Sequence, residues 1–236
     1  MRSLLQALAR FAAPVLLLAA AFVLVYFGNA LPPSLAGLKV YGPYIVLGAG
    51  AALATAFNRG RALIVLVTLV LAYGAQQLWL QQGLSAPGAR GVYAALAVFV
   101  PINAALAAVL PERGVLNRHG VLRLAVVAVE AGIAACFIAA GGARAVGWVW
   151  QKFFPVPFGV GSLPQAGIAT IIACLIVAVA AAFVSRSAVS AGCAGAIIAF
   201  TVAAHVPTAS YTFSIFTMAA GMMMVVAVLH DAVRNR

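Results

Sequence analysis

The chain consists of long runs of apolar residues separated by short polar segments. Eight of these runs are each about 20 residues long, which is the length an α-helix needs to cross the apolar core of a bilayer. The strands of a membrane barrel would be about half as long, with alternating polar and apolar residues. We therefore predict an all-α fold, a polytopic transmembrane helical bundle forming one integral-membrane domain over 1–236, with spans at about 11–27, 40–57, 62–80, 92–110, 121–140, 166–184, 188–206 and 211–229.

Composition agrees with a lipid environment. Apolar residues make up 66% of the chain and charged residues 7%, against about 25% charged residues in soluble domains. The net charge of +11 would suggest a nucleic-acid partner in a soluble protein, but here the basic residues lie in short segments between apolar runs. Membrane topology explains them better, and we expect no nucleic-acid partner. Cys136, Cys174 and Cys193 all fall within apolar runs, which favours buried packing over a disulfide framework.

Basic residues are unevenly divided between the two sides of the predicted bundle. With a cytoplasmic N-terminus, the outer side carries Lys39, Arg90, Arg144 and Lys152, and the other ten of the 14 basic residues lie inside. This bias is typical of short cytoplasmic loops, so we predict a multi-pass membrane protein with both termini in the cytoplasm. The first run has the outline of a signal peptide, but it is long and no A-x-A cleavage site follows it. We expect it to be a retained span.

The longest connection, 141–165, joins the fifth and sixth spans on the predicted outer side. It contains Trp148, Trp150, Phe153 and Phe154, and such aromatic side chains favour the headgroup region. We predict a short interfacial helix here. An anchor in the membrane surface is the favoured interpretation, and a lid over an outward-facing ligand pocket is the alternative.

Glu130 is the one acidic residue that hydropathy places deep within the membrane. It lies ten residues after Gly120, which corresponds to about 15 Å along a helix and to about the bilayer midplane. An ionised carboxylate is costly there, so we expect Glu130 to face other helices and to be protonated or hydrogen-bonded. Asn103 and Thr68 lie at comparable depth, and Asn103 is the predicted partner. Two interpretations of Glu130 are equally favoured. It makes a packing contact between helices, or it contacts a ligand or acts as a switch.

Other polar residues carry weaker signals. Gln76 and Gln77 lie in the outer part of the third span, and at most one of two adjacent amides faces a pocket. Gln76 is therefore a ligand candidate, although packing is the favoured interpretation. The three histidines lack paired ligands, and no nucleotide-binding, hydrolase or metalloprotease motif is present in the sequence. We expect no metal, no cofactor and no catalytic residue in this chain.

Three short segments resemble a known family. The segment 110–124, LPERGVLNRHGVLRL, resembles the loop between spans four and five in the N-terminal multi-pass regions of bacterial GGDEF proteins, the diguanylate cyclases. SLPQAGI at 162–168 is similar to the entry to their sixth span, and VVAVLHDAVRNR at 225–236 to the passage of their last span into the cytoplasm. The resemblance implies a membrane input region located in a bacterial inner membrane. The catalytic GGDEF loop is absent from the sequence, so this chain would not itself make cyclic di-GMP.

These observations lead to a functional hypothesis. We expect a sensory or regulatory membrane module that passes a signal through its last span to a cytoplasmic output domain. The resemblance implies that this output is a diguanylate cyclase and that the module acts as a homodimer. The lipid bilayer is the expected surrounding partner, and the expected ligand is a small molecule or lipid that acts from outside or within the bilayer. A small multi-pass transporter or permease is the alternative function, and a lipid-modifying enzyme is the least favoured.

Overall fold

The computed structural model describes residues 2–27, 36–86, 88–139, 147, 149–151, 163–185, 187–205 and 209–234. The predicted helical bundle is confirmed: eight helices in the described ranges are long and apolar enough to cross a membrane. They are α1 (Arg2–Tyr26), α2 (Ala36–Ala56), α3 (Gly60–Ala75) with its π-helical continuation η3 (Gln76–Leu80), α4 (Ala89–Val109), α5 (Arg118–Ala139), α6 (Gln165–Ser185), α7 (Ala188–His205) and α8 (Ser210–Arg234).

Two helices extend furthest beyond the predicted apolar runs. Helix α1 begins at Arg2, and α8 continues past Leu229 to Arg234. Hydropathy marks where side chains become polar, whereas the backbone hydrogen bonds of a helix continue through polar residues. The third predicted span is one continuous rod that changes from α-helical to π-helical geometry at Gln76.

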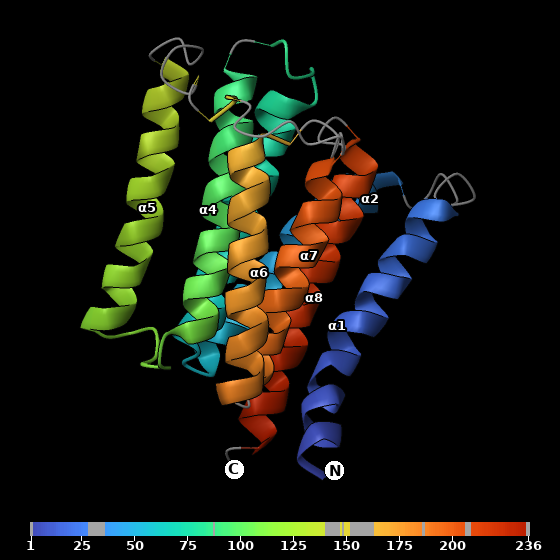
Figure 1. The fold of residues 1–236 in the computed structure, drawn as a ribbon, viewed down its shortest axis with the longest axis vertical. Coiled ribbons are helices and arrows are strands. Elements are labelled where there is room, and N and C mark those ends of the chain that lie inside the picture. The colour runs from blue at the N-terminus through green and yellow to red at the C-terminus, as the bar shows by residue number, and fades with distance from the viewer. Residues whose placement is uncertain are drawn as a thin grey trace.

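Helix α7 forms the centre of the bundle, and α8 makes its most extensive contact with it. Figure 1 shows α5 and α1 at opposite edges, with α4, α6, α7 and α8 between them. The small residues Gly192, Ala196 and Ala199 of α7 are buried inside one chain. A Cβ atom on Gly195 would lie 2.9 Å from Cβ of Pro14 and 2.6 Å from Sδ of Met223, so this glycine lets α1 and α8 approach α7 closely.

The outer faces of the bundle are apolar. Large hydrophobic side chains are exposed along α1, α2, α5 and α6, as expected for helices that face lipid. Helix α5 packs mainly on α4 and α3, so much of its surface is left to the bilayer. Pro14, Pro43 and Pro101 lie inside helices, which membrane helices tolerate when neighbouring groups satisfy the freed carbonyls.

Both termini lie at the same end of the bundle (Figure 1), as an even number of spans requires. We call it the basic end, because the described arginines Arg10, Arg59, Arg61, Arg113, Arg118, Arg123 and Arg234 belong to the helix ends and loops on this side. Two connections pack against each other here. Oδ1 of Asn58, before α3, accepts a hydrogen bond from the Val115 amide, and Oε1 of Glu112 accepts one from the Gly60 amide.

The predicted interfacial helix within 141–165 falls largely outside the described residues. Gly147 and residues 149–151 are described, and Gly147, Val149 and Trp150 have turn conformation. Trp148, Phe153 and Phe154, which were predicted to lie at the outer membrane surface, are also outside the described residues.

Candidate functional site

Glu130 and Asn103 meet between α5 and α4. Nδ2 of Asn103 donates a hydrogen bond to Oε2 of Glu130 over 2.5 Å, which is the contact predicted from their depth. Glu130 lies twelve residues into α5, about 18 Å along the helix. Asn103 is 2% exposed, whereas Glu130 is only half-buried. The amide therefore holds one carboxylate oxygen from the protein side, and the carboxyl group reaches the edge of the bundle.

A groove of about 450 Å³ lies beside this pair. It runs between α3, α4 and α5, and η3 and Tyr44 of α2 complete its wall. Its lining is almost entirely apolar, with Thr68, Asn103 and Glu130 as its polar members apart from Tyr44. We call this the lateral groove, because α5 lies at the edge of the bundle (Figure 1). Three of the four predicted ligand candidates thus line one cavity.

Thr68 is the most unusual polar group of the lateral groove. The residue is 6% exposed, and its Oγ1 is buried without a hydrogen-bond partner among the described residues. A buried hydroxyl without a partner costs about 1–3 kcal/mol. Thr68 therefore offers an unused donor and acceptor at the same cavity as Glu130.

Gln76 lies apart from the other candidates. It is completely buried at the start of η3, where its Oε1 accepts a hydrogen bond from Nε2 of Gln77. Gln77 and Gln81 both donate to Oγ of Ser210 over 3.3 Å, which joins the end of this rod to the start of α8. Gln76 does not line the lateral groove. Its surroundings indicate a structural role.

Trp150 is the one described member of the predicted aromatic group. Its ring stacks on Tyr93 with centroids 6.1 Å apart, and the Arg90 guanidinium lies 5.5 Å from its ring centroid. The Tyr93 hydroxyl donates to the Ala204 carbonyl over 2.5 Å. Trp150 therefore packs on the start of α4, and it is not part of the lateral groove.

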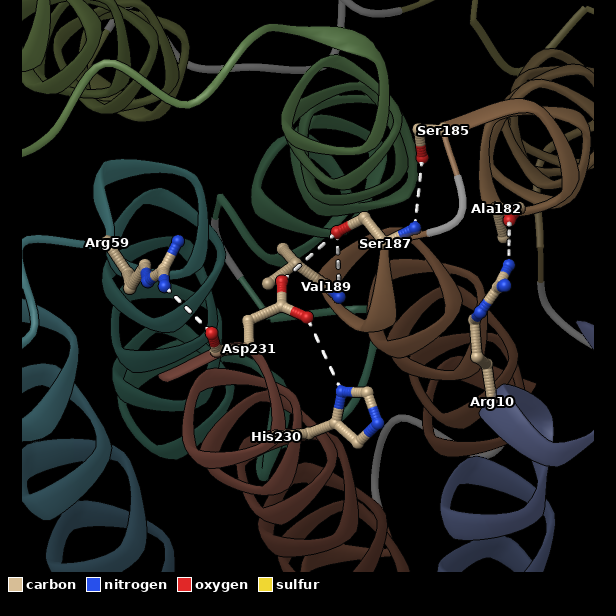
Figure 2. A network of polar contacts seen from close by, with 8 residues as sticks. All are labelled: Arg10, Arg59, Ala182, Ser185, Ser187, Val189, His230 and Asp231. Carbon is tan, nitrogen blue, oxygen red and sulfur yellow. Dashed lines mark hydrogen bonds and ion pairs between the residues drawn. The ribbon is translucent and has the colours of Figure 1, made fainter. Parts of the chain in front are cut away.

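Sequence reasoning missed a polar network at the basic end. Asp231, in the last turns of α8, accepts a hydrogen bond at Oδ2 from Oγ of Ser187 over 3.3 Å, and its carbonyl accepts one from Nη2 of Arg59 over 3.0 Å (Figure 2). Nδ1 of His230 lies 3.5 Å from Oδ1 of the same carboxylate. One residue of α8 thus contacts the segments that lead into α7 and α3.

Arg61 is the second feature that the sequence did not reveal. Its side chain is 7% exposed, and it donates to the carbonyls of Ala107 and Ala108 at the end of α4 and to Oγ of Ser190 in α7. A cation at a helix C-terminus interacts favourably with the helix dipole. Charge counting placed Arg61 in a short cytoplasmic turn, and only the meeting of α3, α4 and α7 shows that it is buried.

A second cavity, of about 390 Å³, opens at the basic end between α1, α7 and α8. Arg10, His230 and Arg234 line it together with small residues of α7. Nη1 of Arg10 also lies 3.5 Å from the carbonyl of Ala182 at the end of α6 (Figure 2). No group of three or more histidine, cysteine, aspartate or glutamate residues suited to a metal ion occurs among the described residues.

Comparisons with known proteins do not assign a function to this site. No protein-family model, no curated protein and no solved structure matches the chain.

The Asn103–Glu130 pair leads to a first prediction. Glu130→Gln keeps an acceptor for Asn103, so the thermal unfolding midpoint in detergent should stay near that of the wild type. Glu130→Ala leaves the buried amide without its partner and should lower stability by about 1 kcal/mol, the usual scale of such contacts within membranes. Equal midpoints for the two variants would show that the hydrogen bond contributes nothing to folding.

Proposed function

We propose that this chain is a sensory input module of a bacterial inner membrane. In this proposal, the occupancy of a site within the bilayer changes the position of the last turns of α8 at the cytoplasmic face. An output domain attached there, or a separate protein that contacts it, then reads the change. The excess of basic residues at the end with both termini supports the cytoplasmic assignment of that end.

The observation that carries the proposal is the double contact of α3. Thr68, Ala72 and Ala75 of this helix line the lateral groove. The same helix follows directly on Arg59, which donates to the Asp231 carbonyl of α8. Nine residues separate Thr68 from Arg59, about 14 Å along a helix. A small shift of α3 therefore changes both the groove and the contact that holds the end of α8.

The π-helical segment η3 supplies an element that can have two arrangements. Leu78 and Trp79 of η3 line the lateral groove. Single π-helical turns within α-helices occur frequently at functional sites. We propose that η3 exchanges its π-helical hydrogen bonds for α-helical ones. Such an exchange would shift α3 along its axis, and ligand binding would favour one arrangement over the other.

The proposed module acts as a homodimer with its output enzyme, a diguanylate cyclase according to the sequence resemblance. Because Gly192, Ala196 and Ala199 are buried inside one chain, the dimer would use lipid-facing helices rather than this face of α7. Passage of a solute, as in a transporter, is the alternative that the reporter experiment below must separate from signalling.

A fusion reporter tests the proposal. A diguanylate cyclase domain joined after Arg236 should produce cyclic di-GMP in cells, and Asp231→Ala should change that output at least threefold because the end of α8 loses its contact with Ser187. Arg113→Ala, which alters a charge of the same end without touching α8, should leave the output unchanged. A green fluorescent protein at the same position should fluoresce, as expected in the cytoplasm. Identical output from wild type and Asp231→Ala would contradict signalling through α8.

A further inference from the structure

We propose that the lateral groove binds a neutral, lipid-soluble molecule with a long apolar body and one hydroxyl or carbonyl group. The ligand enters from the bilayer and places its polar group between Thr68 and Glu130. The proposal that this binding acts as the sensory stimulus rests on the function proposed above, whereas the binding itself does not.

The position of the groove determines where its ligand comes from. The groove lies between helices that span the membrane, and α5, which forms one wall, packs mainly on α3 and α4. Leu71 and Leu78 line the groove and are also exposed on the bundle surface. A molecule dissolved in lipid can therefore reach it sideways, without crossing a headgroup layer. The apolar side chains of the lining match an apolar ligand body.

The hydroxyl of Thr68 identifies the polar end of the site. Threonine in a helix can donate to the carbonyl four residues earlier. Thr55, Thr170 and Thr201 all do so, over 2.8, 2.8 and 2.7 Å. Thr68 makes no such bond, and its buried Oγ1 has no partner among the described residues. Its hydroxyl therefore has no protein partner at the wall of the groove, and a rotation of the Thr68 side chain about χ1 would present it to an occupant.

Glu130 provides the second polar contact. Asn103 donates to Oε2, and a carboxyl group has further lone pairs that can accept a proton from a ligand hydroxyl. When Glu130 is protonated, its own O–H can donate to a ligand carbonyl instead. A ligand hydroxyl can therefore donate to Glu130, and a ligand oxygen can accept from Thr68, because both residues line the groove.

Electrostatics excludes charged headgroups as the best ligands. A charge at the bilayer centre costs several kcal/mol, and an anionic headgroup would also face the Glu130 carboxyl. A neutral alcohol or ketone avoids both costs and still satisfies the Thr68 hydroxyl. A lipophilic amine, which could pair with an ionised Glu130, is the competing chemistry that the experiment must distinguish.

Photo-crosslinking tests the assignment on the full chain in lipid nanodiscs. The probe is a 16-carbon alcohol with a diazirine in its chain, and labelled residues are located by mass spectrometry. We expect labelling at groove residues of α3, η3 and α4, such as Leu71, Leu78 and Phe99. Excess hexadecanol should suppress it at least tenfold, whereas hexadecane, hexadecanoate and hexadecylamine should not. Stronger competition by the amine, or uniform labelling of lipid-facing helices, would overturn the proposal.

Matched threonine variants distinguish specific binding in the groove from non-specific partitioning of the probe into the lipid. Thr68→Val keeps the shape of the side chain and removes the hydroxyl, so groove labelling should fall at least fivefold. Thr170→Val removes a hydroxyl that is already bonded within its helix, and it should leave groove labelling unchanged. Equal labelling in both variants would overturn the role of Thr68. If the probe binds in the groove but the reporter output does not change, the sensory function alone is contradicted. If the reporter responds to Asp231→Ala but no probe binds in the groove, the inference of a ligand site alone is contradicted.

Discussion

Replacement of Arg61 by methionine should lower the thermal unfolding midpoint by on the order of 10 °C, one of the two largest losses of stability that we expect from a single substitution here. Methionine fills much of the space of the arginine stem but cannot donate a hydrogen bond. The Ala107 carbonyl then loses the Nε donor that lies 2.5 Å away, and Ser190 loses a donor 2.7 Å away. Hydrogen bonds to charged groups contribute about 1.5–3 kcal/mol each. Methionine also removes the desolvation cost of the buried charge, which offsets part of this loss, so we expect a net loss of about 3 kcal/mol.

Two further variants show whether the guanidinium itself is responsible. Arg61→Lys keeps the charge but cannot reach three acceptors from one planar group, so its midpoint should fall between those of wild type and Arg61→Met. Ser190→Ala removes one partner and should cost about 1 kcal/mol. Unfolding can be followed by tryptophan fluorescence in detergent. A midpoint for Arg61→Met within 2 °C of the wild type would contradict the proposed role of Arg61 in joining α3, α4 and α7.

The membrane spans were predictable because one physical constraint acts on each of them separately. A run of about 20 apolar residues must satisfy its backbone hydrogen bonds internally when it is in lipid, whatever its neighbours are. Hydropathy therefore predicted all eight helices. It could not predict the change to π-helical geometry at Gln76, which no apolar pattern marks. There the half-buried Gln77 donates to the buried Gln76 and to Ser210 of α8.

Depth in the membrane also predicted one contact of the site. Helices in a bundle run nearly parallel to the membrane normal, so residues at equal depth on neighbouring helices can meet, as Asn103 and Glu130 do. Depth does not determine which face of a helix points inward. The Thr68 hydroxyl lacks a hydrogen bond to the carbonyl four residues earlier because of its side-chain rotamer. The volume of the lateral groove depends on the spacing of α5 from α3.

Polar residues at the membrane edge were the main difficulty for sequence reasoning. The positive-inside bias treats arginines as equivalent solvated charges. Arg61 is buried among helix ends, whereas Arg59, two residues earlier, contacts α8. Nothing in the sequence marks Asp231 as a contact residue, because an acidic residue beside a basic terminus is ordinary. Its contacts come from residues about 40 and 170 positions earlier in the chain, which no local pattern relates to it.

Gly120 lies in the first turn of α5, where there is no room for a side chain. Asn117 caps this helix, because its Oδ1 accepts a hydrogen bond from the Gly120 amide over 2.9 Å. A Cβ atom on Gly120 would lie 2.0 Å from the carbonyl oxygen of Val115, which is a backbone atom and cannot rotate away. Gly120→Ala must therefore displace the loop or the first turn of α5. We expect a loss of about 3 kcal/mol, the upper range for an overpacked site.

Gly132→Ala is the matched control, since it lies in the same helix and nothing lies within 4 Å of its added Cβ. Alanine favours a helix over glycine by about 1 kcal/mol, so this variant should unfold at or above the wild-type temperature. Because α5 forms one wall of the lateral groove, a displaced α5 should also separate Glu130 from Asn103 and reduce groove labelling in Gly120→Ala. If the two alanine variants have the same groove labelling and the same thermal midpoint, the loop is not tightly packed against Gly120. The position of α5, on which the groove depends, would then not be fixed by this packing.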